Sequence, residues 1–165
     1  MYPKTEVTCW IQKIALKKLL EEANDKYPLE TGGIFMGYQA NMGNDVIVTD
    51  VIGPGPYATH KYCGYIPDSA FHEKEISRIY SESNQVNTYL GDWHTHPNGS
   101  GILSNKDKKV LQRISRCRES RNLNPIMAIL VVCEDVEFLL WRYYEKKSWY
   151  FLLPTLVEMN IELYE

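Results

Sequence analysis

The sequence predicts a single-domain α/β fold, and three observations support this. The chain has 165 residues, the size of one ordinary globular domain. Its 44% hydrophobic and 24% charged content excludes a disordered or fibrous chain. Segments with helical spacing of apolar residues interleave with short apolar runs that are typical of strands, some of them antiparallel. We therefore expect residues 1–165 to form one layered domain.

In the first half of the chain, alternating apolar residues indicate strands, and apolar residues three or four apart indicate a helix. Val7, Cys9 and Ile11 alternate at the start. Pro28 prevents the first helix from continuing, which places residues 29–33 on a turn. The expected elements are a strand at 7–11, a helix at about 12–24, and strands at 34–38 and 46–52 joined by a polar hairpin at 39–45.

The second half begins with a loop, because Gly53-Pro54-Gly55-Pro56 ends the preceding strand. We expect this loop to be irregular up to Ile66. The third expected helix opens at Ser104 and carries an apolar face, and Asn122 to Pro125 terminate it. The remaining expected elements are a helix from 67–69 to about 83, strands at 89–94, 126–133 and 136–144, and a strand at 149–153 after a turn at 145–148.

Charge and cysteine usage limit the partners and the compartment. Eighteen basic and 21 acidic residues give a net charge of −3, which provides no global field for holding nucleic acid. The longest apolar run, 126–133, is far shorter than the roughly 20 residues of a membrane span. We therefore expect neither nucleic acid nor a membrane as partner. The four cysteines are scattered without a C-x-x-C pair, which predicts reduced, mostly buried thiols in a cytoplasmic protein.

The most informative segment is His94-Thr95-His96-Pro97, with Asp107 further on. Residues two apart on a strand share a face, so His94 and His96 bring two imidazoles to one point. Asp107, in the first turn of the next helix, adds a carboxylate oxygen. Two histidines and a carboxylate are typical of a catalytic zinc site, which keeps a fourth position for water. Zinc lowers the pKa of such a water to about 7, so we expect one Zn²⁺ ion on these three residues.

Two further residues complete the expected chemistry. Glu30 is the best candidate for a proton carrier, because the glycines that follow it permit close approach of this turn to a distant loop. Ser104 would donate its hydroxyl to the oxyanion that develops at an attacked carbonyl. Ser104-x-x-Asp107 is also the pattern of a helix capping box, with Asp in place of Glu. The two roles are compatible, because the cap fixes the turn that carries Asp107.

These residues resemble the JAMM or MPN+ (JAB) zinc metallopeptidases, whose motif is an upstream Glu followed by H-[ST]-H-P-x6-S-x2-D. Glu30 to Gly37 is similar to the family's E-T-G-G-x-x-x-G segment, and Gly91 to Pro97 is similar to small stand-alone bacterial members. The resemblance covers about residues 7–144. It implies a JAB/MPN fold, with a central mixed β-sheet flanked by about three helices, similar to that of cytidine deaminases. The deaminase ligand set, H-x-E and P-C-x-x-C, is absent.

The resemblance also implies an activity, which is cleavage after the C-terminal glycine of ubiquitin or a ubiquitin-like protein. It implies zinc on His94, His96 and Asp107, a proton carried by Glu30 to the leaving lysine amine, and a tetrahedral intermediate stabilised by Ser104. Stand-alone bacterial members accompany conjugation enzymes, including those of CBASS antiphage systems. We therefore expect a conjugated ubiquitin-like tail as substrate, and conjugation-pathway proteins as partners.

Two other functions compete with this interpretation. Related bacterial proteins process sulfur-carrier proteins, which would keep the chemistry and change the pathway. A non-catalytic MPN scaffold is the alternative of another class, and the retained metal ligands argue against it. Selectivity for one polyubiquitin linkage is not expected, because the insertion that confers it in eukaryotic members would fall at 118–125, where this chain has only a short connection.

Other residues have more than one interpretation. Tyr57, Tyr62 and Tyr65 lie where the family's other insertion would fall, and they either contact a substrate or cover the core. The segment 104–121 carries seven basic and two acidic residues, as a solvent-facing helix or as a docking surface for an acidic partner. The remaining two histidines, His60 and His72, have no motif partner, so we expect surface or structural roles for them.

Overall fold

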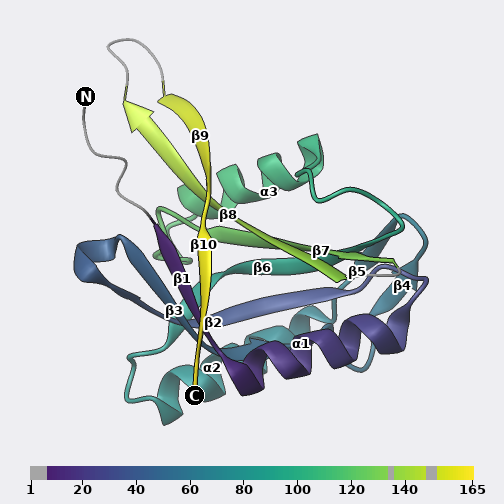
Figure 1. The fold of residues 1–165 in the computed structure, drawn as a ribbon. Helices are drawn as coiled ribbons and strands as arrows, with labels where there is room; N and C mark the ends of the chain where they lie inside the picture. Colours follow the sequence, from purple (N-terminus) through teal and green to yellow (C-terminus); the bar gives the residue numbers. More distant parts are fainter. Residues whose placement is uncertain (1–6, 134–135, 148–151) are drawn as a thin grey trace.

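The computed structural model describes residues 7–133, 136–147 and 152–165, which include a mixed eight-stranded sheet in the order β10-β1-β3-β2-β6-β7-β8-β9 (Figure 1). Its strands are β1 (Thr8–Gln12), β2 (Gly32–Ala40), β3 (Asp45–Ile52), β6 (Thr88–Pro97), β7 (Ile126–Val132), β8 (Val136–Lys147), β9 (Leu152–Glu158) and β10 (Asn160–Tyr164). The helices are α1 (Lys13–Lys26), α2 (Ser69–Glu82) and α3 (Asn105–Arg116), with a 3-10 turn at Asn41–Gly43. Two short strands, β4 (Thr59–Lys61) and β5 (Gly64–Ile66), form a separate hairpin.

Helices cover both faces of the large sheet, which confirms the expected single-domain α/β class. α1 packs on one face, where its Leu19 joins a buried cluster with Phe35 of β2. α2 and α3 pack on the other face, against clusters that contain Ile34 of β2 and Met127 of β7 respectively. These last two residues share a face because both are in register with Asp92 of β6.

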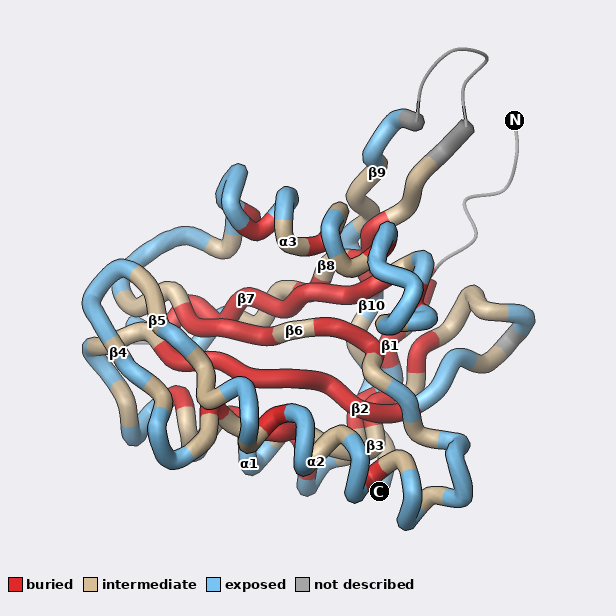
Figure 2. The backbone as a smooth tube through the Cα atoms, turned by 180° about the vertical axis from the view of Figure 1, so that it is seen from behind, coloured by how far each residue is buried: buried red, intermediate tan, exposed pale blue. Residues whose placement is uncertain are grey.

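The centre of the sheet is its most buried part, as Figure 2 shows for β2, β6 and β7. All seven residues of β7 are buried, and so are the first six of β2. β6 lies between them, antiparallel to β2 and parallel to β7. The strand that carries the two neighbouring histidines is therefore held on both sides by buried backbone hydrogen bonds.

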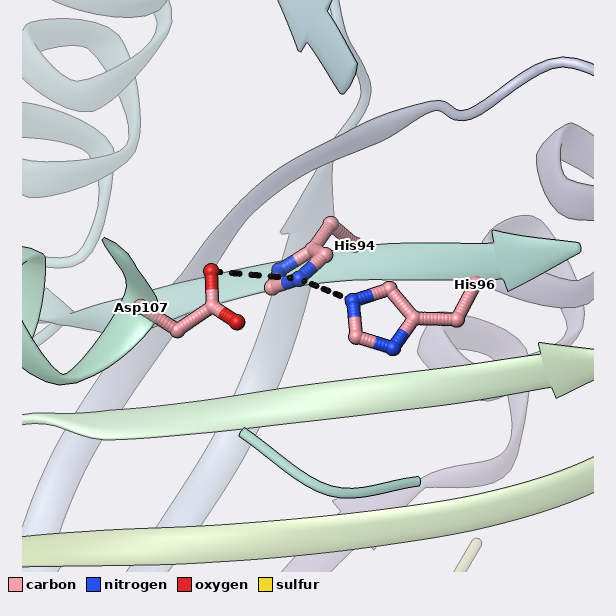
Figure 3. Close-up of side chains that lie close together, drawn as sticks. All are labelled: His94, His96 and Asp107. Atoms are coloured by element: carbon pink, nitrogen blue, oxygen red, sulfur yellow. Dashed lines mark hydrogen bonds and ion pairs between the residues drawn. The ribbon is translucent and has the colours of Figure 1, made fainter. Parts of the chain in front are cut away.

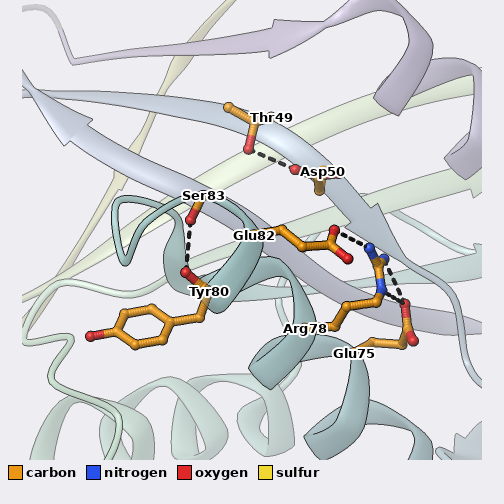
Figure 4. Close-up of polar contacts among 7 residues, drawn as sticks. All are labelled: Thr49, Asp50, Glu75, Arg78, Tyr80, Glu82 and Ser83. Carbon is orange, nitrogen blue, oxygen red and sulfur yellow. Dashed lines mark hydrogen bonds and ion pairs between the residues drawn. The ribbon is translucent and has the colours of Figure 1, made fainter.

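α2 begins and ends where the sequence predicts. Its exposed side chains form polar contacts with one another (Figure 4). Arg78 pairs with Glu75 at 2.8 Å and with Glu82 at 2.6 Å, one turn away in either direction. The Ser83 hydroxyl donates to the Tyr80 carbonyl at 3.1 Å, where the helix stops. Exposed pairs of this kind contribute about 0.2–0.5 kcal/mol each, so the packing of Ile79 against the sheet matters more.

Several boundaries differ from the sequence-based expectation. The expected irregular loop at 53–66 contains the β4–β5 hairpin. The expected turn at 145–148 is wrong, because β8 continues through Lys147 and pairs there with β9. Of the strand expected at 149–153, residues 149–151 lie outside the described residues, and β9 begins at Leu152. The third helix ends at Arg116, and β10 was not expected.

The cysteines differ from expectation as well. Only Cys9 is buried, whereas Cys63, Cys117 and Cys133 are exposed. The prediction of mostly buried thiols is therefore wrong for three of them. Within the described part of the chain, no helix combines the length and the apolar character that crossing a membrane requires.

Candidate metal centre

His94 and His96 project from the same face of β6 and meet Asp107 from the first turn of α3 (Figure 3). Nε2 of His94 lies 3.1 Å from Nε2 of His96 and 3.5 Å from Oδ1 of Asp107. The three ligand atoms all lie within 4.8 Å of one another. Two ligands of a tetrahedral zinc ion, each at about 2.0–2.1 Å from it, are about 3.3 Å apart. The spacing and the two-nitrogen, one-carboxylate donor set therefore fit a single metal ion.

Contacts behind the ligands set their orientation. Nδ1 of His96 lies 2.7 Å from the Ser100 carbonyl oxygen. Because a carbonyl only accepts, Nδ1 carries the hydrogen, and the lone pair of Nε2 faces the site. The Ser104 amide donates to Oδ2 of Asp107 at 2.8 Å, while the Asp107 amide donates to the Ser104 hydroxyl oxygen at 3.2 Å. This capping box leaves Oδ1 of Asp107 directed at His94.

Burial also affects the protonation of His94. It lowers the pKa of His94 to about 4, against the opposing effect of the Asp107 carboxylate. His94 is therefore neutral at pH 7, which is the form that binds a metal through its free lone pair. Asp107 is itself buried at the helix start.

Glu30 lies between α1 and β2, outside regular structure, and is half-buried. Burial raises the pKa of its carboxyl group, with His96 opposing and Asp107 adding to the shift.

A cleft of about 350 Å³ brings together all five residues singled out from the sequence, Glu30, His94, His96, Ser104 and Asp107. A larger cavity of about 830 Å³ is lined by residues of β2, α2, α3 and the segments that follow the two helices, and none of the five lines it. The size of a cavity alone therefore does not locate the candidate site.

Two buried threonines join the Glu30 turn to β6, the strand that carries His94 and His96. The Thr31 amide donates to the Thr95 hydroxyl oxygen at 2.9 Å, and the Thr95 amide donates to the Thr31 carbonyl at 2.9 Å. Thr95 stands between the two histidine ligands, and Thr31 directly follows Glu30. These bonds bring together two segments 64 positions apart in the sequence.

Three cleft residues had no assigned role at the metal centre. Asp92 lines the cleft, and its Oδ1 accepts the Tyr89 hydroxyl at 2.8 Å. Its position two residues before His94, on the same strand face, is a signal that could have identified it. Arg113 of α3 also lines the cleft. The Tyr65 side chain, from β5, lies against Gly32: a Cβ atom added to Gly32 would be 2.5 Å from the Tyr65 hydroxyl oxygen.

The other aromatic and histidine residues lie elsewhere. Tyr57 and Tyr62 are largely exposed, so they do not cover the core. His72 is buried, with Nε2 2.8 Å from the Gly53 carbonyl oxygen. His60 approaches the backbone of Glu30. Structural roles, expected for both histidines, agree with these contacts. Arg116 of the basic helix pairs with Glu145 at 2.8 Å.

The family and the relatives of this chain make it a hydrolase of the metallopeptidase class. Residues 12–148 match the family described as prokaryotic homologues of the JAB domain, and the chain belongs to this family. It is 39% identical over 122 residues to the probable metalloprotease y4qB of Sinorhizobium fredii, a match that covers 73% of this chain and 74% of the relative.

Other similarities are more distant. A protein named CD-NTase/cGAS isopeptidase from Escherichia coli is 29% identical over 68 residues, which is 41% of this chain and 42% of that protein. Its namesake from Vibrio cholerae is 26% identical over 84 residues, 51% of this chain and 53% of that one. A protein of Desulfitobacterium hafniense solved in solution shares the fold, with a TM-score of 0.62 at 18% identity over 95% of this chain and 93% of the other.

Proposed function

We propose that this chain is a zinc-dependent isopeptidase or peptidase that hydrolyses the bond after the C-terminal glycine of a ubiquitin-like protein, in the cytoplasm. The observation that carries the proposal is the triangle of His94, His96 and Asp107 in one cleft with Glu30 and Ser104. The motif resemblance to JAMM peptidases supports the ubiquitin-like substrate. We further propose that residues 1–165 act as one catalytic unit.

The residues divide the work of hydrolysis. Zinc, when held by the two histidines and Asp107, supplies a Lewis acid and a water of lowered pKa. The Glu30 carboxylate accepts a proton from the attacking water and returns it to the departing amine. The oxygen of Ser104 already accepts the Asp107 amide, so its hydroxyl hydrogen is free to donate to the developing oxyanion.

The hairpin provides a place for the substrate's tail. β6 is paired on both sides, so it offers no free edge. In the described part of the chain, β5 pairs with β4 alone, and Cys63, Gly64 and Tyr65 of this hairpin line the cleft. An extended tail ending in glycine would add as a strand beside β5 and place its last carbonyl at the metal.

The names of two relatives support a proposal for the biological setting. The two proteins named CD-NTase/cGAS isopeptidases support a role in reversing protein conjugation within a CBASS-type antiphage system. The partners would then be the conjugated protein and the enzymes of that conjugation pathway.

Two kinds of substrate test the proposal. In one, a candidate modifier is fused through its terminal glycine to a second peptide, and in the other the same glycine is joined to a lysine side chain. Wild type should cleave after the terminal glycine and lose activity on chelation. Glu30→Gln should keep about one zinc per chain and lose at least about a hundredfold in kcat. Glu21→Gln, an exposed carboxylate on α1, is the matched control and should remain active.

Metal content separates the roles of the ligands from that of the base. His94→Ala and Asp107→Ala should each release zinc, measured by elemental mass spectrometry. Full zinc retention in both variants would refute the ligand set, and an active Glu30→Gln enzyme would refute the base. Cleavage confined to a sulfur-carrier precursor would move the enzyme to the alternative pathway.

A further inference from the structure

The backbone of Glu30 is held by the β4–β5 hairpin. Glu30 belongs to no helix or strand, so no ladder satisfies its polar groups. Its amide donates to the Lys61 carbonyl at 2.8 Å. Its carbonyl oxygen lies 3.0 Å from Nδ1 of His60. Both backbone groups of the proposed base therefore depend on two adjacent residues of one hairpin.

The chemistry of the second contact fixes the direction of the hydrogen bond. A carbonyl oxygen can only accept, so Nδ1 of His60 carries the hydrogen and donates it. His60 is half-buried, and it is in register with Tyr65 across the hairpin. Tyr65 lies over Gly32. The hairpin thus contacts the glycine turn twice, at Glu30 and at Gly32.

The far side of the same turn is held by different bonds. Thr31 exchanges two hydrogen bonds of 2.9 Å with Thr95 of the metal-binding strand. The Thr31 amide and the Glu30 carbonyl belong to the same planar peptide group, so this pairing holds that group from its nitrogen end. His60 holds the same peptide group from its carbonyl end, and the Lys61 carbonyl holds the peptide before Glu30, so these contacts together set the starting direction of the Glu30 side chain.

We propose that His60 is a positioning residue, which aims the Glu30 carboxylate by donating a hydrogen bond from Nδ1 to the Glu30 carbonyl. The effect on catalysis rests on the proposed function of Glu30. Misplacing a reacting group by about 1 Å can cost about a hundredfold in rate. Loss of the bond should therefore lower kcat, while KM and zinc content stay the same.

Substitutions at His60 separate the hydrogen bond from the bulk of the ring. His60→Leu fills similar space without a donor, and kcat should fall about tenfold to a hundredfold. His60→Asn places an amide donor where Nδ1 stood, and it should restore most of kcat. Thr59→Ala is the matched control, because Thr59 precedes His60 and its side chain is exposed. If the leucine variant does not fold, His60→Ala replaces it in the same comparison.

Hydrogen exchange at the Glu30 amide, followed by mass spectrometry, gives a readout that needs no substrate. Exchange should be faster in His60→Leu than in wild type and should return toward wild type in His60→Asn. Unchanged exchange in the leucine variant, or an asparagine variant that behaves like leucine, overturns the proposal. If exchange follows the expected order but the wild type cleaves no modifier, the proposed function fails while the hold of His60 on the Glu30 backbone stands.

Discussion

At the scale of single residues, the middle position of His94-Thr95-His96 has a clear physical role. Its side chain points away from the metal ligands, since neighbours on a strand face opposite sides. Thr95 is fully buried, and its hydroxyl is the partner of the equally buried Thr31 amide. A hydroxyl at this position therefore satisfies a group that water cannot reach.

Thr95→Val should destabilise the protein. Valine has nearly the same shape but no hydroxyl, so the Thr31 amide would be left buried without a partner, at a cost of about 1–3 kcal/mol. Thr95→Ser keeps the hydroxyl and should retain more of that stability. Urea unfolding of the three proteins measures the difference, and a valine variant as stable as wild type would contradict this account.

The thiols should separate into two classes when labelled with a maleimide at pH 8. Burial raises the pKa of Cys9 to about 12, although the charge of Arg142 opposes the shift. Cys9 therefore stays protonated and inaccessible in the folded protein. Its three exposed counterparts should react first, and Cys9 only after unfolding. Mass spectrometry of native and denatured samples counts the labels, and native labelling of Cys9 would contradict its burial.

At the scale of helices and strands, local signals predicted some elements and could not predict others. Pro28 and the apolar spacing before it placed α1, and the Ser104 cap placed the start of α3. β10 follows β9 after a single residue, and its partner β1 lies at the other end of the chain. Periodicity within a short segment contains no information about such a distant partner. The β4–β5 hairpin was missed because three-residue strands are too short to show a period.

Removing residues 160–165 should destabilise the sheet at the β1 edge. β10 is parallel to β1 along all five of its residues, so its loss would expose unpaired amides and carbonyls of β1. We expect unfolding at a lower urea concentration, and association that increases with protein concentration in light scattering. Tyr164→Phe is the control, since it removes only the 3.2 Å bond from its hydroxyl to the Val48 carbonyl. A truncated protein as stable as this control would show that β10 is dispensable.

At the scale of the whole molecule, the metal centre joins elements that pack separately. Two proposed ligands come from the centre of the sheet, the third from α3, and the proposed base from the turn before β2. Motif spacing predicted that the three candidate ligands meet, because a strand face and a helix start bring them together over 14 positions. The glycines after Glu30 made it a candidate, and the family resemblance supported its place at the same site, because the threonine pairing that brings it there leaves no local pattern.

Zinc should stabilise the folded protein by mass action. The ligands converge only in the folded state, so free zinc at about 100 times its Kd should add about 2.7 kcal/mol to the free energy of unfolding. Thermal unfolding with and without zinc, and after chelation, measures this gain. Asp107→Ala lacks one ligand and should gain much less. An equal gain in that variant would mean that zinc binds elsewhere.

The pairing of β1 with β10 also has a consequence for synthesis on the ribosome. The two strands are separated by 152 positions, from Thr8 to Asn160, so at about 5–20 residues per second the first waits about 8–30 seconds for its partner. Every proposed catalytic and metal-binding residue lies between positions 30 and 107 and emerges well before that. A nascent chain thus presents these proposed site residues while the β1 edge of its sheet is still unpaired. We expect a chaperone that prevents association at this edge to act in that interval.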